Sequence, residues 1–178
     1  MTEEINKSAR KKQIDLIDSK IIRILQEDGR LSNTEIARNL DISEATVRTR
    51  IKRLIDEGFI QIVAVSDPFK LGFEITGDLY IHAEMQKINQ VIDALKSFRE
   101  LWYIIMTTGE ANINAEFVVR SLSDLHELVY DRISAIDGVT RIDISVITRY
   151  VKRKYDYGTA LDDPESPIDP SVKDNRRR

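Results

Sequence analysis

The sequence predicts an α+β protein in which three short helices are followed by a βαββαβ sheet domain. Two observations lead to this class. Apolar residues recur at helical spacing in three consecutive segments of residues 1–60, and the segments that follow alternate between strand-like and helix-like patterns. Each half can bury a small core, because hydrophobic residues make up 42% of the 178-residue chain.

Composition excludes several classes of protein. There is no cysteine, which rules out disulfides, zinc–thiolate sites and thiol nucleophiles. No apolar run approaches the ~18 residues of a membrane span, and residues 1–12 lack the apolar stretch of a secretory signal. We therefore expect a cytoplasmic protein. The net charge of -3 does not by itself indicate nucleic-acid binding, so any such function must come from local patterning.

Local signals set the ends of the first two helices. Apolar residues at helical spacing in residues 17–25 predict a helix that ends near Gly29. Ser32 followed by Glu35 is a capping-box pattern, which predicts the start of a second, short helix. That helix ends at Asp41, and a very short turn leads to the third.

The third helix completes a helix-turn-helix. Ser43 is its predicted N-cap, and Gly58 ends it. Val47, Ile51 and Leu54 form its apolar face, which should pack against the first two helices. Three helices with this spacing have the layout of a helix-turn-helix unit.

The outward side of the third helix is rich in cations. Four of the six residues in positions 48–53 are Arg or Lys, and positions 45–55 contain no Asp or Glu. At ~100° per residue, the helix turns four residues away from its apolar face: Ala45, Thr49, Lys52 and Arg53. Thr46 and Arg48 flank them, and Glu44 lies at the start of the helix. A solvated surface helix is the alternative, but such helices usually mix charges. We therefore expect this side to enter the major groove of DNA, where Arg and Lys meet phosphates or guanine.

The second half of the chain repeats a β-α-β pattern after a predicted strand at residues 59–66. Predicted strands cover residues 79–85, 101–107, 113–120 and 139–151, and predicted helices cover 88–98 and 121–136. This order is the ferredoxin-like arrangement, with both helices on one face of the sheet. Because we expect apolar residues on both faces, the free face should pair with a partner.

These elements divide the chain into four parts. They are a helix-turn-helix domain in residues 1–60, a linker strand and hinge in 61–73, a ferredoxin-like domain in 74–155 and a disordered tail in 156–178. The tail is predicted from composition, since residues 158–178 hold three of the four prolines and no aromatic residue. Its terminal Arg triplet is compatible with a weak phosphate contact, but a solvated end is the simpler interpretation.

The sequence offers little to a catalytic function. His82 and His126 are the only histidines, and neither has a partner at ligand or dyad spacing. There is no Gly-rich phosphate loop, Ser/His/Asp set or HExxH motif, so we predict no catalytic, metal or cofactor site. Two alternatives to a DNA-binding regulator stay open: a regulatory subunit of a metabolic enzyme, and a ligand-sensing module without DNA binding. The cations of the third helix speak against the second.

Four stretches together resemble the Lrp/AsnC family of transcription regulators. They are IDLIDSKIIRILQEDGRLSNTEIARNL, SEATVRTRIKRLIDEGFIQ, DPFKLGF and TTGEAN, within residues 13–155. The resemblance implies a winged helix-turn-helix that binds double-stranded promoter DNA. It also implies a ferredoxin-like domain that forms homodimers through its sheet, often assembled into octamers, and that binds a small-molecule effector, an amino acid or a related metabolite.

The resemblance also assigns residues. Base reading would fall on Glu44, Ala45, Thr46, Arg48 and Thr49, in a helix capped by Ser43, and phosphate contacts on Arg50, Lys52 and Arg53. Effector binding would fall on the hairpin residues Thr107, Thr108, Gly109, Glu110 and Asn112.

Two positions depart from the family pattern. The turn before the recognition helix usually holds Gly, and here it holds Asp41, which tolerates left-handed backbone angles better than most residues. The effector loop usually reads Gly-x-x-Asp, and here it ends in Asn112, which has no charge to hold an ammonium group. Either the effector differs from the common α-amino acids or is missing, or Asn112 is a turn residue that shapes the hairpin.

Overall fold

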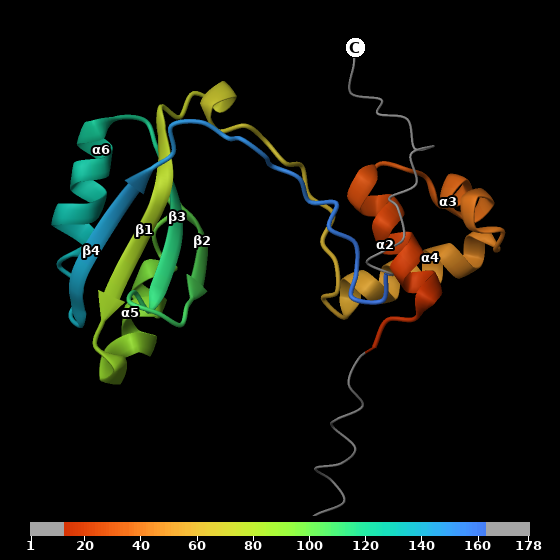
Figure 1. The fold of residues 1–178 in the computed structure, drawn as a ribbon, viewed down its shortest axis with the longest axis horizontal. Coiled ribbons are helices and arrows are strands. Elements are labelled where there is room, and N and C mark those ends of the chain that lie inside the picture. Colours follow the sequence, from red (N-terminus) through yellow and green to blue (C-terminus); the bar gives the residue numbers. More distant parts are fainter. Residues whose placement is uncertain (1–12, 163–178) are drawn as a thin grey trace, which may run out of the picture. The chain divides into compact units, whose positions relative to one another are not determined.

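The computed structural model describes residues 13–162, which form two compact units (Figure 1). The first contains residues 13–64 and 153–162, and the second contains residues 65–152. The boundary between residues 64 and 65 lies inside the predicted linker. Residues 163–178, with most of the predicted tail and its Arg triplet, lie outside the described residues. None of the helices in residues 13–162 is long and apolar enough to cross a membrane.

Three helices build the first unit, as predicted. They are α2 (Leu16–Glu27), α3 (Asn33–Leu40) and α4 (Glu44–Asp56). Ser32 and Glu35 form the predicted capping box at the start of α3. Asp15 and Asp18 form a second capping box at the start of α2, which the sequence analysis did not identify. Both boxes satisfy backbone N–H groups that the first helical turn leaves unpaired.

The helices enclose a small apolar core. Ile21 of α2, Ile36 of α3, and Val47 and Leu54 of α4 are fully buried. The turn between α3 and α4 closes because Asp41 adopts the left-handed conformation (φ 53°, ψ 47°), as the sequence led us to expect. The core therefore fixes which side of α4 faces outward.

The strand predicted at residues 59–66 is absent from the described part of the chain. The segment is irregular, and Ile62 and Val63 expose 51% and 69% of their surface. A β-rich sequence forms a strand only where a neighbouring strand supplies hydrogen bonds and packing. No described strand pairs with this segment, so the prediction was wrong.

The prediction of a disordered tail from residue 156 was wrong for residues 156–162. Residues 156–162 belong to the first unit, where Gly158, Thr159 and Asp162 form hydrogen bonds with α2. Composition indicated that this segment cannot build a core of its own. Polar contacts with another element hold it instead, and composition carries no information about such contacts.

The second unit is an antiparallel sheet of four strands in the order β2-β3-β1-β4. Its strands are β1 (Ile75–Ala83), β2 (Leu101–Met106), β3 (Ile113–Val119) and β4 (Val139–Val146). Helix α5 (Ile88–Leu95) joins β1 to β2, and α6 (Leu122–His126), continued by a π-helix (Glu127–Ile133), joins β3 to β4. Short 3-10 turns at Phe69–Leu71 and Met85–Lys87 flank β1. This is the predicted ferredoxin-like fold.

The helices of the second unit cover one face of the sheet (Figure 1). Leu79 and Ile81 of β1 and Phe117 of β3 are fully buried there, together with Leu95 and Leu128 from the helical segments. Burial of each such side chain contributes about 1.5–3 kcal/mol. This core is the main source of stability of the unit.

The opposite face of the sheet is more polar than predicted. In the cross-strand register, Asp78 lies opposite Glu116, while Tyr80 lies opposite Asn114 on one side and Asp143 on the other. Residues directly opposite one another share a face, and it is the face away from the buried Leu and Ile side chains of β1. Tyr103 and Ile105 of β2 lie opposite Glu116 and Asn114 and are exposed on this same face, so the expectation of apolar residues on both faces holds only in part. This face offers polar groups from which a site can be built.

Candidate functional site

Four residues form the exposed side of α4. Arg48 and Lys52 expose 67% and 73% of their side chains, and Ala45 and Thr49 are also exposed. Their spacing of three or four positions places them along one face of the helix. The sequence analysis placed all four on or beside the outward face.

Short-range contacts order this face without burying it. Arg48 pairs with Glu44 and Lys52 pairs with Asp56, each one helical turn away. Thr34 of α3 donates a hydrogen bond to Glu44 Oε2 (2.9 Å). That bond and the pair with Arg48 lower the pKa of the Glu44 carboxyl, which stays ionised at neutral pH. Because exposed ion pairs contribute little to stability, a phosphate can replace either carboxylate at small cost.

The first turn of α4 uses its polar side chains for capping. Ser43 Oγ accepts a hydrogen bond from the Thr46 amide (3.1 Å), and the two hydroxyl oxygens lie 2.8 Å apart. Ser43 is thus the N-cap, as predicted. Both hydroxyls are engaged in holding the start of the helix.

Arg50 and Arg53 turn toward α2, against expectation, although they keep 25% and 36% of their side-chain surface exposed. Arg50 Nη1 lies 2.7 Å from Asp15 Oδ2 and 2.7 Å from Asp18 Oδ1, and Arg53 also pairs with Asp18. The hydrogen bonds to Asp15 and Asp18 raise the pKa of Arg50. Asp18 is 1% exposed, so these pairs tie α4 to α2 from the inside. The helical spacing predicted that Arg53 faces outward, and the resemblance implied that both arginines contact phosphates. Both instead pair with Asp18, a buried carboxylate on α2 that has no local signal in the sequence of α4.

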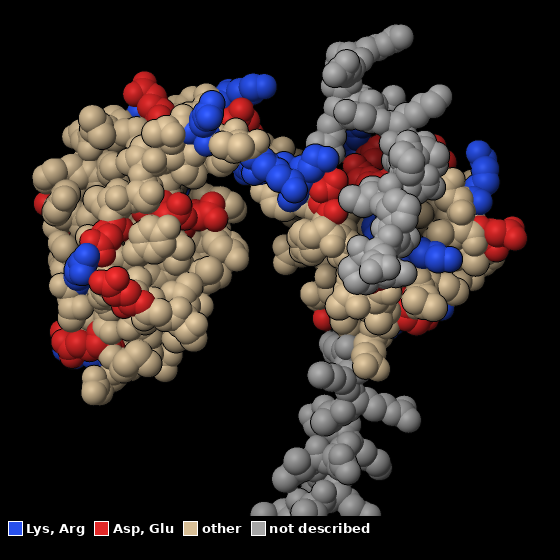
Figure 2. Space-filling view, viewed as in Figure 1, with Lys and Arg blue, Asp and Glu red and all other residues tan. Residues whose placement is uncertain are grey.

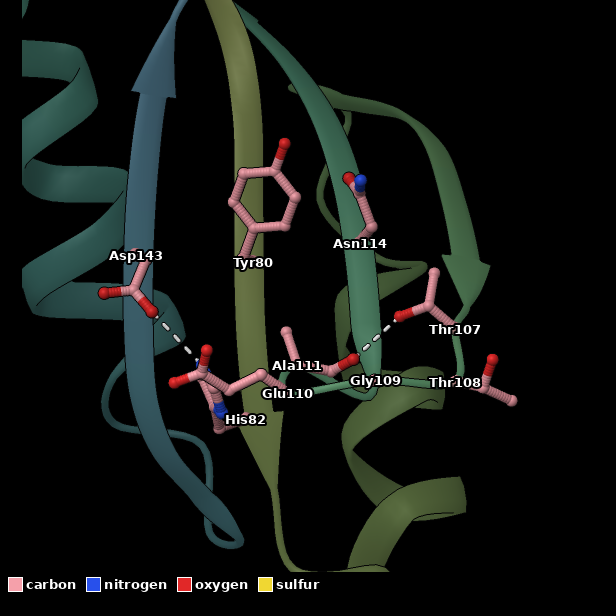
Figure 3. Close-up of a pocket in the computed structure, with 9 residues that line it drawn as sticks. All are labelled: Tyr80, His82, Thr107, Thr108, Gly109, Glu110, Ala111, Asn114 and Asp143. Carbon is pink, nitrogen blue, oxygen red and sulfur yellow. Dashed lines mark hydrogen bonds and ion pairs between the residues drawn. The ribbon is translucent and has the colours of Figure 1, made fainter.

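A pocket of about 370 Å³ lies on the free face of the sheet, beside the hairpin that joins β2 to β3 (Figure 3). It is lined by Tyr80, His82, Thr107, Thr108, Gly109, Glu110, Ala111, Asn114 and Asp143. The first two stand on β1, Asn114 on β3 and Asp143 on β4, while the hairpin supplies the rest. Figure 2 shows Asp and Glu side chains gathered on this side of the unit.

The two carboxylates of the pocket, Glu110 and Asp143, both have partners. His82 Nε2 lies 3.1 Å from Asp143 Oδ2. Arg141, which is not among the lining residues, lies 2.9 Å from Asp143 and 3.4 Å from Glu110. Hydrogen bonds from Arg141 and then His82 outweigh burial and lower the pKa of Asp143, which keeps this carboxyl ionised. The lining therefore presents two carboxylates and contains no Lys or Arg.

One acceptor in the pocket is unused. Asn114 Oδ1 is buried and has no hydrogen-bond partner among the residues that the structure describes. In Figure 3 its amide stands on the same side of the sheet as Tyr80 and Asp143. Leaving a buried polar atom unpaired costs about 1–3 kcal/mol. A ligand that donates a hydrogen bond to this oxygen would recover that cost.

Asn112 is not part of the lining, although the resemblance implied an effector role for it. Its Oδ1 accepts from the Ala83 amide (3.0 Å), and its Nδ2 donates to the Ala83 carbonyl (2.7 Å). This pair extends the β1–β3 ladder beyond its last backbone partners, Ile81 and Ile113. The geometry agrees with the alternative that Asn112 shapes the hairpin. The other four predicted effector residues, 107–110, do line the pocket.

The sequence analysis missed five of the lining residues. They are Tyr80, His82, Ala111, Asn114 and Asp143. His82 was judged a structural histidine because no partner stood near it in sequence, and Asp143 is 61 positions away. The alternation of side chains along β1 was visible in the sequence. The strand order that brings β4 beside β1 has no local signal.

Two family models match the chain. Residues 14–61 match the winged helix-turn-helix DNA-binding model, and residues 79–157 match the Lrp/AsnC ligand binding domain. The first match covers α2, α3 and α4, and the second covers all the residues that line the pocket.

Relatives support both matches along most of their length. An uncharacterized HTH-type transcriptional regulator from Pyrococcus abyssi (strain GE5 / Orsay) is 39% identical over 148 residues, which cover 83% of this chain and 94% of the relative. The HTH-type transcriptional regulator LrpA from Pyrococcus horikoshii is 33% identical over 140 residues, which cover 78% of this chain and 99% of the relative.

Solved structures share the fold at lower identity. A transcriptional regulator from Neisseria meningitidis in complex with L-Met has a TM-score of 0.72 at 21% identity, and the match covers 80% of this chain and 94% of that one. E. coli AsnC has a TM-score of 0.71 at 21% identity, over 80% and 97% of the two chains. Taken with the relatives above 30% identity, the helix-turn-helix and the sheet domain show that the chain belongs to the Lrp/AsnC family of helix-turn-helix transcriptional regulators.

Proposed function

We propose that this regulator reads operator DNA with the exposed side of α4, formed by Ala45, Arg48, Thr49 and Lys52. The observation that carries the proposal is their shared exposure on one face of the third helix of a helix-turn-helix unit. Arg48 and Lys52 can bind phosphates or guanine, and the methyl groups of Ala45 and Thr49 can meet thymine. Ion pairs of two other α4 arginines with Asp18 hold the helix in position from behind.

We infer that two copies act together on the operator. A dimer would present two recognition helices to successive major grooves, which lie about 34–36 Å apart, so the operator should be an imperfect palindrome. In the described chain β2 is an edge strand that exposes Trp102 and Tyr103 by 50% and 45%, which supports association of the sheet domains. Assembly of dimers into an octamer is the further expectation that the family gives.

The DNA proposal is tested by titrating labelled promoter DNA with the wild-type protein, Arg48→Ala and Lys52→Ala. Each substitution should weaken binding about tenfold, since a specific contact is worth about 1–3 kcal/mol. Loss of one phosphate contact should also flatten the slope of log K against log salt by about 0.9. Lys96→Ala removes a cation that is 64% exposed on the second unit and is the matched control. Wild-type affinity and salt slope in both α4 variants would overturn the proposal.

We further propose that the pocket beside the β2–β3 hairpin binds an effector that carries an ammonium or amidinium group. The carboxylates of Glu110 and Asp143 and the unused oxygen of Asn114 all favour a cationic hydrogen-bond donor. The Neisseria structure with L-Met supports a small-molecule ligand for this type of domain. No Lys or Arg lines the pocket itself, and Arg141 beside it is already paired with Glu110 and Asp143. A free amine therefore suits the pocket better than a zwitterionic amino acid.

Matched ligands test the proposed effector class by calorimetry. Lysine and cadaverine differ only in the carboxylate, as do methionine and 3-(methylthio)propylamine. Each amine should bind about tenfold more tightly than its amino acid, and Asp143→Asn should remove most of that affinity, because a charge-assisted hydrogen bond contributes about 1.5–3 kcal/mol. Asp93→Asn makes the same charge change at a 74% exposed site on α5 and should leave the preference intact. Tighter binding of the amino acids would refute this ligand class and leave the DNA proposal standing.

A further inference from the structure

We propose that residues 158–162 form a latch that fastens the chain to α2, so that the DNA-binding unit is joined to the ligand-binding unit at two points instead of one. The chain passes between the two units once between residues 64 and 65 and again between residues 152 and 153. If no contact held the returning segment on α2, the second passage of the chain would not restrain the helices of the DNA-binding unit. The latch goes beyond the proposed function and uses it only to supply a DNA readout.

Ser19 is the centre of the latch. Its hydroxyl donates to Asp162 Oδ1 (2.8 Å) and lies 2.6 Å from Thr159 Oγ1, from which it can accept. Ser19 is only 2% exposed although its side chain is polar. These hydrogen bonds place the returning segment against Ser19.

Two further residues of α2 complete the contact. Gln26 and Gly158 form a reciprocal pair, in which the Gly158 amide donates to Gln26 Oε1 (2.9 Å) and Gln26 Nε2 donates to the Gly158 carbonyl (3.3 Å). Arg23 Nη1 lies 4.0 Å from Asp162 Oδ1. Ser19, Arg23 and Gln26 are spaced by four and three positions, so they form one stripe along the helix. These three side chains contact both the backbone and the side chains of residues 158–162.

The segment has its own defined shape. Thr159 donates its amide to Asp162 Oδ2 (2.6 Å), and the Asp162 amide returns to the Thr159 carbonyl (3.1 Å). Gly158 has φ +72°, and a Cβ there would overlap the Asp162 carboxylate. Only glycine fits this position without strain. The turn thus presents Asp162 to Ser19 in a fixed orientation, which lowers the entropy cost of closing the latch.

Both chain connections leave from strands that border the effector pocket. β1 carries Tyr80 and His82, and β4 carries Asp143. These two strands are paired neighbours, and the Ile147 amide donates to the Thr76 carbonyl (2.9 Å) where they lead into the connections. A ligand that shifts β1 and β4 would therefore act on both connections. The latch attaches the second connection, which follows β4, to helix α2 of the helix-turn-helix.

Cysteine crosslinking tests whether the latch forms. The chain has no cysteine, so a disulfide in Ser19→Cys/Thr159→Cys can only join the introduced pair. Under mild oxidation this variant should form an intrachain disulfide at least tenfold faster than Lys20→Cys/Thr159→Cys, in which the exposed neighbour of Ser19 carries the thiol. Intact mass and non-reducing electrophoresis measure the product. Equal rates in the two variants, or a product that joins two chains, would overturn the latch within one chain.

DNA of two designs tests what the latch does. Asp162→Asn should weaken binding to a two-half-site operator about three- to tenfold, because a more loosely held helix-turn-helix loses effective concentration at the second half-site. Binding to a single half-site should stay within about twofold of wild type. Gln26→Ala, which removes only the Gly158 pair, should act in the same direction, and the oxidised Ser19→Cys/Thr159→Cys protein should bind the full operator like wild type. Equal loss on both DNA designs in both variants would mean that the contact only stabilises the helices, and would overturn the proposal. If Arg48→Ala binds both DNA designs more weakly than wild type, the DNA-binding role of α4 stands even where the latch proposal fails.

Discussion

At the scale of single residues, Asp18 carries the most consequential contacts of the DNA-binding unit. Its carboxylate is almost fully buried and pairs with Arg50 and Arg53 on α4, while it also closes the capping box of α2 with Asp15. A buried charge is tolerated only when it is paired and hydrogen-bonded. The same side chain therefore starts one helix and sets the position of the recognition helix.

Removal of Asp18 should destabilise the protein strongly. Asp18→Ala leaves two arginines without their buried partner, and breaking such a pair costs about 3–5 kcal/mol. We expect a fall of that size in the free energy of unfolding, measured by urea denaturation. Asp28→Ala, which removes a 46% exposed carboxylate at the other end of α2, should change it by only about 0.5 kcal/mol. Equal effects of the two substitutions would contradict the structural role of Asp18.

Gly77 is the tightest position in the sheet. A Cβ there would overlap the carbonyl oxygen of Ser145 on β4 and lie 3.0 Å from the Phe117 ring. Gly77→Ala must push β4 away from β1, and overpacking of this kind costs about 1–3 kcal/mol. Gly29→Ala is the control, because its Cβ would meet neighbours only at 3.6 Å and beyond. A Gly77→Ala protein with the melting temperature of wild type would show that the strands can move apart freely.

At the scale of elements, the end of the β1–β3 ladder depends on a side-chain amide. Asn112 both donates to and accepts from the backbone of Ala83, which an amide can do and an ionised carboxylate cannot. Asn112→Asp would place a carboxylate against the Ala83 carbonyl. We expect a loss of about 1–3 kcal/mol in the free energy of unfolding, the cost of leaving a buried partner unsatisfied. Amine binding in the pocket should be affected far less than by Asp143→Asn; the reverse order would return Asn112 to the effector site.

An ion pair ties the π-helical segment to the start of β2 and should make stability depend on pH. Arg132 Nη1 lies 2.8 Å from Glu100 Oε1, and this hydrogen bond outweighs burial and lowers the pKa of Glu100 below its ordinary value of 4.5. The folded state then binds the proton less readily than the unfolded state, so the pair adds stability above that pH and loses it as the pH falls through the lower folded pKa.

The prediction is a difference between two melting curves. Wild type should melt higher than Glu100→Gln at pH 7, and the difference should shrink as the pH falls below the ordinary glutamate pKa of 4.5. Arg132→Gln should reproduce the effect, since it removes the same pair from the other side. A difference that stays constant as the pH falls would mean that the substitution acts through packing rather than through charge.

At the scale of the whole molecule, the two units have separate cores and are linked by two passages of the chain. The sequence analysis anticipated the two units and one passage. The second passage lies within residues 74–155, which were assigned to the ferredoxin-like domain, and the returning residues 156–162 were assigned to a disordered tail. Composition describes what a segment can bury by itself and not what it can bind. The hydrogen bond between Ser19 and Asp162 joins residues 143 positions apart, beyond the reach of any pattern read along the chain.

The sequence by itself determined the caps of α3 and α4, the order of the elements within each unit, and the exposure of Ala45, Arg48, Thr49 and Lys52 on α4. Caps such as Ser32 with Glu35, and the left-handed turn at Asp41, act over at most four positions, so their physics is complete within the local sequence. Tertiary structure alone decided that Arg50 and Arg53 turn inward to Asp18, that Asp143 stands beside His82 in the pocket, and that the segment at Gly158 returns to α2. The reason is that charge pairing and strand register depend on which distant residues the core brings within a few ångströms.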